Sequence, residues 1–181
     1  MNLPNKLTIF RVILIPFFVF FLLTDVLGAN GDYLALVIFI VASLTDMLDG
    51  KIARKNNLVT NFGKIMDPLA DKILVYSAFC LMVPQLVPSW MLIIILAREF
   101  TVAGMRTVAA AEGIVIAAGL SGKIKTVLQM IAVPLLLLVP ALPNFYPLFI
   151  TAKVFLWASL IMTVYSGISY VVQNRKVFSM E

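Results

Sequence analysis

Four aspartates gather in one short stretch of an otherwise apolar chain. They form two pairs, Asp46 with Asp49 and Asp67 with Asp71. The spacings, i,i+3 and i,i+4, put the two carboxylates of each pair on one helical face. If the two faces meet, four carboxylates repel one another strongly unless protons or cations neutralise them. Because oxygens are the only ligands offered, we predict that the four residues hold two hard divalent cations, Mg²⁺ or Mn²⁺.

Small and basic residues accompany the two pairs. Gly50 and Ala53 flank the first pair, and small side chains let helices approach closely in lipid. Gly63 precedes the second pair, where it can supply a tight turn. Arg54 follows the first pair by one helical turn, where a guanidinium can bind a phosphate group. The alternative is that the charges decorate helix ends, but paired acids in such a position are costly without a function.

Histidine is absent from the chain, and cysteine occurs once, as Cys80. Without imidazole there is no histidine metal ligand, general base or phosphoryl carrier. One thiol cannot build a disulfide framework or a thiolate metal site. A phospholipase-D-like enzyme, which relies on paired histidines, is therefore excluded.

The composition is that of a membrane protein. Apolar residues make up 62% of the 181 residues, charged residues 13%, and the mean hydropathy is +1.04. About 20 residues cross a hydrocarbon core roughly 30 Å thick, and the chain has room for about six such spans between its Gly-, Pro- and Asn-rich turns. We predict an all-α integral membrane protein with six transmembrane helices in a single domain, residues 1–181. The helices are expected at residues 7–24, 33–53, 65–83, 89–108, 125–139 and 147–172.

Lysine and arginine are distributed unevenly between the expected connections. The connections around residues 25–32, 84–88 and 140–147 contain neither residue, whereas both ends of the chain and the other two connections are basic. Basic loops stay in the cytoplasm during membrane insertion. Both termini and the aspartates are therefore expected on the cytoplasmic side.

The fixed positions from Asp46 to Asp71, D-x2-D-G-x2-A-R-x8-G-x3-D-x3-D, match the signature of the CDP-alcohol phosphatidyltransferase family. The opening "NLPNKLTIFRVILIPFF" also resembles the first helix of that family. The segments "LAREFTVAGMR" and "SGKIKT" resemble its phosphatidylglycerophosphate synthase branch. The resemblance implies a six-helix membrane enzyme that transfers the phosphatidyl group of CDP-diacylglycerol to an alcohol and releases CMP.

The resemblance also implies roles for individual residues. Asp46, Asp49 and Asp67 would hold two metal ions on the pyrophosphate, and Asp71, also at this centre, would be the base. A homodimer in a bacterial-type cytoplasmic membrane, with its active site facing the cytoplasm, is implied as well. The residues expected to bind CDP-diacylglycerol are Asn5, Thr8, Arg11, Gly50, Ala53, Arg54 and Gly63. For the first three of these, simple anchoring at the membrane interface is the alternative.

Four further cations, on the same predicted side, favour an anionic acceptor. They are Arg98, Arg106, Lys123 and Lys125. Arg98 lies well inside the fourth predicted span, where an idle charge is costly, although an internal pair with Glu99 would also explain it. Glycerol 3-phosphate fits such a site. Inositol phosphate fits the cations equally well, so the choice between the two rests on resemblance.

Two other functions stay open from the residues. One is transfer to phosphatidylglycerol, as in a cardiolipin synthase of the same family. The other is a small cation transporter that uses the aspartates as an ion path. Transporters place such acids near the bilayer midplane, whereas these cluster at one end of their helices. Membrane lipids are expected partners, and no nucleic acid is expected.

Overall fold

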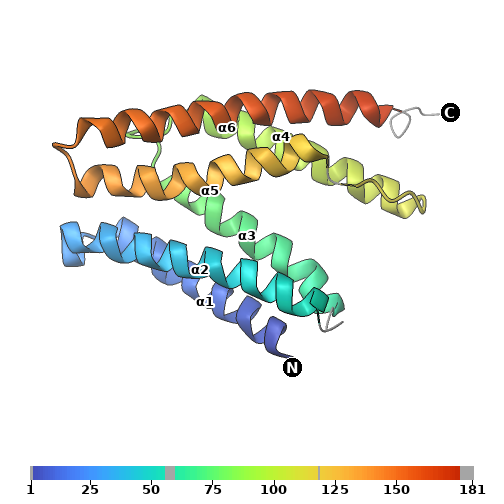
Figure 1. Cartoon of the computed structure of the whole chain (residues 1–181), viewed down its shortest axis with the longest axis horizontal. Coiled ribbons are helices and arrows are strands. Elements are labelled where there is room, and N and C mark those ends of the chain that lie inside the picture. The colour runs from blue at the N-terminus through green and yellow to red at the C-terminus, as the bar shows by residue number, and fades with distance from the viewer. Residues whose placement is uncertain (1, 56–59, 118, 176–181) are drawn as a thin grey trace. The chain divides into compact units, whose positions relative to one another are not determined.

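A computed structural model of the chain describes residues 2–55, 60–117 and 119–175 (Figure 1). Within these ranges, the side chains at positions 25, 29, 49, 51, 53–55 and 64 lie outside the description. The described part is all-α, as predicted, and contains no strand. Its elements are α1 (Leu3–Leu23), the 3₁₀ turn η1 (Asp25–Leu27), α2 (Ala29–Lys55), α3 (Asn61–Leu81), α4 (Ser89–Ala111), α5 (Leu120–Ala141) and α6 (Tyr146–Gln173).

Long apolar helices make this a membrane protein. Four helical segments of the described part are long and apolar enough to cross a membrane: Leu3–Leu23, Asn30–Leu48, Leu120–Ala141 and Tyr146–Gln173. Large apolar side chains, such as Phe17 of α1 and Ile161 of α6, are exposed along them, as expected where lipid covers the surface. The other two predicted spans coincide with α3 and α4, whose charged residues interrupt their apolar runs. The count of six spans and the orientation of the termini stay predictions.

The chain divides into two compact units. The first contains Met1–Met82 and Val133–Ile150, and the second contains Val83–Ala132 and Thr151–Glu181. The helices α5 and α6 each contribute to both units. The single domain over residues 1–181 therefore stays a prediction.

In the first unit, α1 packs against both α2 and α3. Phe18 of α1 meets Phe39 of α2 with their ring centroids 6.0 Å apart, and both rings are buried. Two turns earlier in α1 and two turns later in α2, Arg11 meets Asp46, so the two helices run antiparallel (Figure 1). Thr8 of α1 contacts Asp67 of α3. The N-terminal half of α1 thus lies between the aspartate-bearing ends of α2 and α3.

The start of α3 differs from the prediction at Gly63. The helix begins at Asn61, earlier than the expected residue 65, because Thr60 supplies its N-cap. The extended backbone of Thr60 lets its Oγ1 accept the N–H of Gly63 at 3.1 Å. Gly63 therefore lies within the first helical turn, and its predicted role in a tight turn is wrong.

In the second unit, α4 and α6 run side by side in the same direction. Trp90, at the N-terminal end of α4, meets Trp157, in the middle of α6, with their ring centroids 5.7 Å apart. Near their C-terminal ends, Val102 and Met105 of α4 pack against Tyr170 of α6 in a buried cluster. This packing determines which face of α4 turns toward α6, and so where the charged residues of α4 lie.

Candidate functional site

The structure brings two of the four predicted metal ligands together. Asp46 lies near the end of α2 and Asp67 in the second turn of α3, and both carboxylates contact the N-terminal half of α1. Asp71 follows Asp67 by one helical turn and is half-buried. The fourth ligand, Asp49, falls outside the described side chains, as do Ala53 and Arg54.

Arg11 contacts the first of these carboxylates. Its Nη1 lies 2.6 Å from Oδ1 of Asp46, and the arginine side chain is 0% exposed while that of Asp46 is 35% exposed. A fully buried guanidinium needs such a partner, since an isolated buried charge is strongly unfavourable. Arg11, like Asn5 and Thr8, therefore lies inside the protein rather than at a lipid-facing anchor position.

Oxygen atoms converge around Gly63. Thr8 Oγ1 donates to Oδ1 of Asp67 at 2.5 Å, and Thr60 Oγ1 donates to Oδ1 of Asn5 at 2.8 Å. A Cβ added at Gly63 would lie 3.3 Å from Asp67 Oδ2, 3.4 Å from Thr60 Oγ1 and 3.5 Å from Asn5 Oδ1. Glycine at this position leaves the close approach of α1 and α3 undisturbed.

The side chains around Gly63 offer carboxylate, amide and hydroxyl oxygens, and these donor atoms suit a hard divalent cation. Among the side chains that the structure describes, no group of three or more His, Cys, Asp or Glu residues could hold a metal ion. Asp49 would be the additional acidic ligand. The donor atoms present are thus of the kind that such an ion prefers.

Gly50 differs from the prediction for small residues near the aspartates. A Cβ added there would meet nothing within 4 Å, so Gly50 does not provide close helix packing in the described part. Among the described residues, the predicted close packing is therefore absent at this position, and the space beside Gly50 is open.

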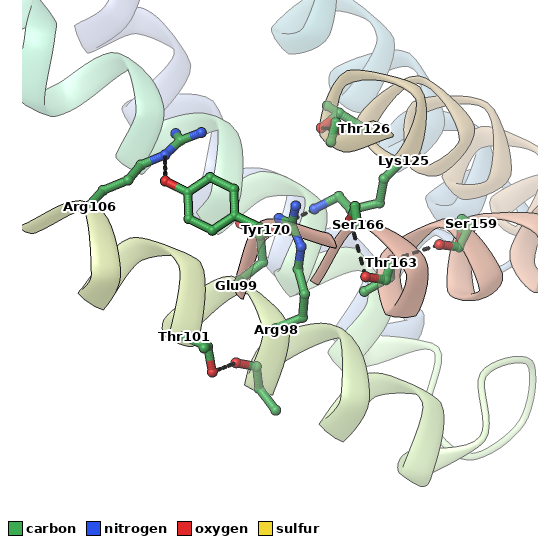
Figure 2. A network of polar contacts seen from close by, with 12 residues as sticks. Arg98, Glu99, Thr101, Arg106, Lys125, Thr126, Ser159, Thr163, Ser166 and Tyr170 are labelled. Carbon is green, nitrogen blue, oxygen red and sulfur yellow. Dashed lines mark hydrogen bonds and ion pairs between the residues drawn. The ribbon is translucent and has the colours of Figure 1, made fainter. Parts of the chain in front are cut away.

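A second polar cluster lies in the other unit (Figure 2). Arg98 Nη1 donates to Oε1 of Glu99 at 2.6 Å, and Lys125 Nζ of α5 donates to the same oxygen. The side chains of Arg98, Glu99 and Lys125 are 12%, 10% and 4% exposed. The Arg98–Glu99 pair considered from the sequence is thus present, with Lys125 joined to it.

The other two predicted acceptor cations are placed differently. Arg106 donates from Nε to the hydroxyl of Tyr170 at 3.1 Å, and its Cζ lies 5.5 Å from the centroid of that ring (Figure 2). Lys123 is exposed in the first turn of α5. Of the four cations, the structure therefore joins Arg98 and Lys125 directly through one carboxylate.

Sequence reasoning missed several polar residues of these clusters. Thr60 could have been found, because a threonine directly before a helix is a common N-cap. Tyr170 and Gln129 carry no comparable signal, because each is one of several polar residues scattered along an apolar helix and belongs to no recognisable motif. Their burial and position become visible only when the helices are packed.

A model of the CDP-alcohol phosphatidyltransferase family matches residues 1–165. A protein of Bacillus subtilis (strain 168), named CDP-diacylglycerol--glycerol-3-phosphate 3-phosphatidyltransferase, is 47% identical over 96% of this chain and 95% of its own. A protein of the same name from Rickettsia felis is 38% identical over 98% of this chain and 97% of its own. A Mycobacterium tuberculosis protein named probable phosphatidylglycerophosphate synthase is 37% identical over 94% of this chain and 80% of its own.

The chain belongs to the CDP-alcohol phosphatidyltransferase family. The resemblance drawn from the aspartate spacing is confirmed, because the family match covers both aspartate pairs and five of the six helices completely.

Proposed function

We propose that this protein transfers the phosphatidyl group of CDP-diacylglycerol to sn-glycerol 3-phosphate, forming phosphatidylglycerophosphate and releasing CMP. The observation that carries the proposal is the 47% identity, over 96% of the chain, to a protein named for this reaction. The two polar clusters support it, since one offers carboxylates and the other offers cations. Transfer to inositol phosphate or to phosphatidylglycerol is the alternative within the family.

Asp46, Asp49, Asp67 and Asp71 would hold two divalent cations, Mg²⁺ or Mn²⁺. Such ions would neutralise the charge of the pyrophosphate and polarise the phosphorus that is attacked. The oxygen atoms around Gly63 support this assignment, as do the contacts of Asp46 and Asp67 with the same half of α1. The proposed binding set for CDP-diacylglycerol is Asn5, Thr8, Arg11, Gly50, Ala53, Arg54 and Gly63.

The transfer requires a base at the acceptor hydroxyl, and we assign this role to Asp71. The hydroxyl oxygen forms a bond to the phosphorus of the phosphatidyl group, while the bond from that phosphorus to CMP breaks. Asp71 takes the hydroxyl proton, and CMP leaves with the bonding electron pair. A direct displacement needs no covalent phosphoenzyme, which agrees with the absence of histidine from the chain.

The acceptor phosphate is assigned to Arg98, Arg106, Lys123 and Lys125. Arg98 and Lys125 carry most weight, because two cations share one carboxylate and leave a formal charge of +1 for an anion to neutralise. A small dianion with a primary hydroxyl, such as glycerol 3-phosphate, suits this arrangement. An acceptor without net charge, such as serine, would be stabilised less by these cations.

The proposed setting is a bacterial cytoplasmic membrane, crossed six times, with both termini and the active site at the cytoplasmic face. The parallel packing of α4 along the candidate span α6 supports α4 as a further span. The contacts of α3 with α1 support α3 in the same way. A homodimer is proposed from the resemblance to the family.

A purified-protein assay tests the function. Labelled CDP-diacylglycerol is offered with glycerol 3-phosphate, inositol 1-phosphate, serine and phosphatidylglycerol as competing acceptors, in the presence of Mg²⁺ or Mn²⁺. We expect CMP release and labelled phosphatidylglycerophosphate as the main product. A different main product would show that the protein uses a different acceptor. The absence of CMP release with every acceptor would refute the proposed transferase activity.

A further inference from the structure

The side chain of Arg98 lies between two glycines of neighbouring helices. A Cβ added at Gly167 of α6 would lie 2.9 Å from Cγ of Arg98, closer than real side chains approach. A Cβ added at Gly122 of α5 would lie 3.3 Å from Nη2 of Arg98. The two glycines, Gly122 and Gly167, therefore form a slot that admits the arginine side chain. One glycine faces the aliphatic part of Arg98 and the other faces its guanidinium, so the slot restricts the side chain at both places.

The far end of the arginine is held by Glu99. This carboxylate accepts from Arg98 and from Lys125, so it joins α4 to α5 (Figure 2). The slot acts on the aliphatic stem and one edge of the guanidinium, and Glu99 acts on another edge. Three helices thus position a single guanidinium.

A purely structural ion pair would not need this arrangement. Glycine inside a helix is less favourable than alanine, so Gly167 weakens α6 unless the space above it is used. Nε of Arg98 is buried and finds no hydrogen-bond partner among the described residues. Nε2 of Gln129, which is 3% exposed and one turn beyond Lys125 on the same face of α5, also finds none there. Buried donors are normally paired, and the oxygens of a phosphate would supply the missing acceptors.

We propose that Gly122, Gly167 and Glu99 are positioning residues that hold Arg98 for the phosphate of an anionic acceptor alcohol. The inference rests on the proposed function, because it concerns the acceptor site of that reaction. Its substrate class is an alcohol that carries a phosphomonoester. The glycines act through Arg98 and do not touch the substrate.

The test compares Gly167→Ala with a matched control, Gly104→Ala. Gly104 also lies inside a helix, α4, but a Cβ added there meets nothing within 4 Å. We expect Gly167→Ala to raise KM for glycerol 3-phosphate about tenfold or more, the effect of misplacing one charge-assisted hydrogen bond. KM for CDP-diacylglycerol should stay unchanged in both variants, and Gly104→Ala should match the wild type.

A double variant separates positioning from a general packing defect. In Arg98→Ala the Cγ atom is gone, so adding Gly167→Ala to it should raise the acceptor KM no further. If Gly167→Ala does not fold, Gly122→Ala replaces it, because its added Cβ meets only the end of the arginine side chain. Independent, multiplying effects of Gly167→Ala and Arg98→Ala would overturn the inference, as would an unchanged acceptor KM in Gly167→Ala. Wild-type turnover with glycerol 3-phosphate is measured in the same series, so failure of the proposed function is recognised separately.

Discussion

In the first unit the carboxylates of Asp46 and Asp67 both contact the N-terminal half of α1, where the buried guanidinium of Arg11 pairs with Asp46. In the second unit the cations of Arg98 and Lys125 share one carboxylate, that of Glu99. Charges removed from water must be balanced, so an excess of one sign indicates the sign of the ligand that completes the site. The first cluster is therefore suited to added cations and the second to an added anion.

The two clusters also differ in how glycine is used. At Gly63 an added Cβ would meet three oxygen atoms of polar side chains, whereas at Gly167 it would meet the carbon stem of an arginine. In the first case glycine lets two helices bring polar atoms together. In the second case it makes room for one long side chain to cross between helices. Close approach thus brings polar oxygen atoms together in one unit and leaves room for a charged side chain in the other.

The largest expected effect comes from Asp67→Asn, which removes one negative charge from the first cluster without changing its volume. The amide oxygen can still accept from Thr8, so the fold should persist. We expect the rate of CMP release at saturating Mg²⁺ to fall by more than about 100-fold. Mutation of a residue that only hydrogen-bonds to a metal ligand lowers activity less, by about 10- to 100-fold. Helix content and the melting temperature in detergent serve as controls. Near-wild-type turnover would show that Asp67 is not a metal ligand.

Asp71→Asn tests whether the members of the first cluster differ in role. If Asp71 is the base, its loss should lower kcat by about 10²- to 10⁴-fold. Binding of CDP-diacylglycerol, measured by titration without acceptor, should change little, because the role begins at the acceptor hydroxyl. A large loss of donor affinity with a small loss of kcat would make Asp71 chiefly a ligand.

Lys125→Gln tests the second cluster by removing its excess positive charge. We expect KM for glycerol 3-phosphate to rise about 10- to 100-fold, since a hydrogen bond to a charged group contributes roughly 1.5–3 kcal/mol. KM for CDP-diacylglycerol should hardly change. Lys123→Gln is the matched variant two residues away, and its exposed side chain predicts a smaller effect. Equal weakening of both substrates in Lys125→Gln would mean that the lysine supports the fold rather than the acceptor.

The smallest expected effect is that of Gly50→Ala, which asks what occupies the open space in the first unit. Among the described residues, the added Cβ meets no atom within 4 Å there or at Gly104, so neither variant should lower the melting temperature. We expect Gly50→Ala to raise KM for CDP-diacylglycerol a few-fold, because the substrate would approach the helix at this point. Unchanged donor kinetics in both variants would remove Gly50 from the binding set.

The sequence alone determined the helices and the family. Apolar runs of membrane-spanning length predicted six helices, and all six are present, because hydrophobicity and turn residues are local properties of the chain. The aspartate spacing predicted two carboxylate pairs on helical faces for the same reason. The start of α3 was misplaced, because an N-cap by Thr60 competes with the apolar pattern that was used to set the boundary.

Only the tertiary structure decided which side chains meet. The pairing of Arg11 with Asp46, the hydrogen bond from Thr60 to Asn5, and the shared use of Glu99 by two cations join residues far apart in the chain. Such contacts depend on the rotation and depth of each helix against its neighbours, which no local pattern specifies. The position of Arg98 between Gly122 and Gly167 arises in the same way, because a slot between helices exists only once the helices are packed.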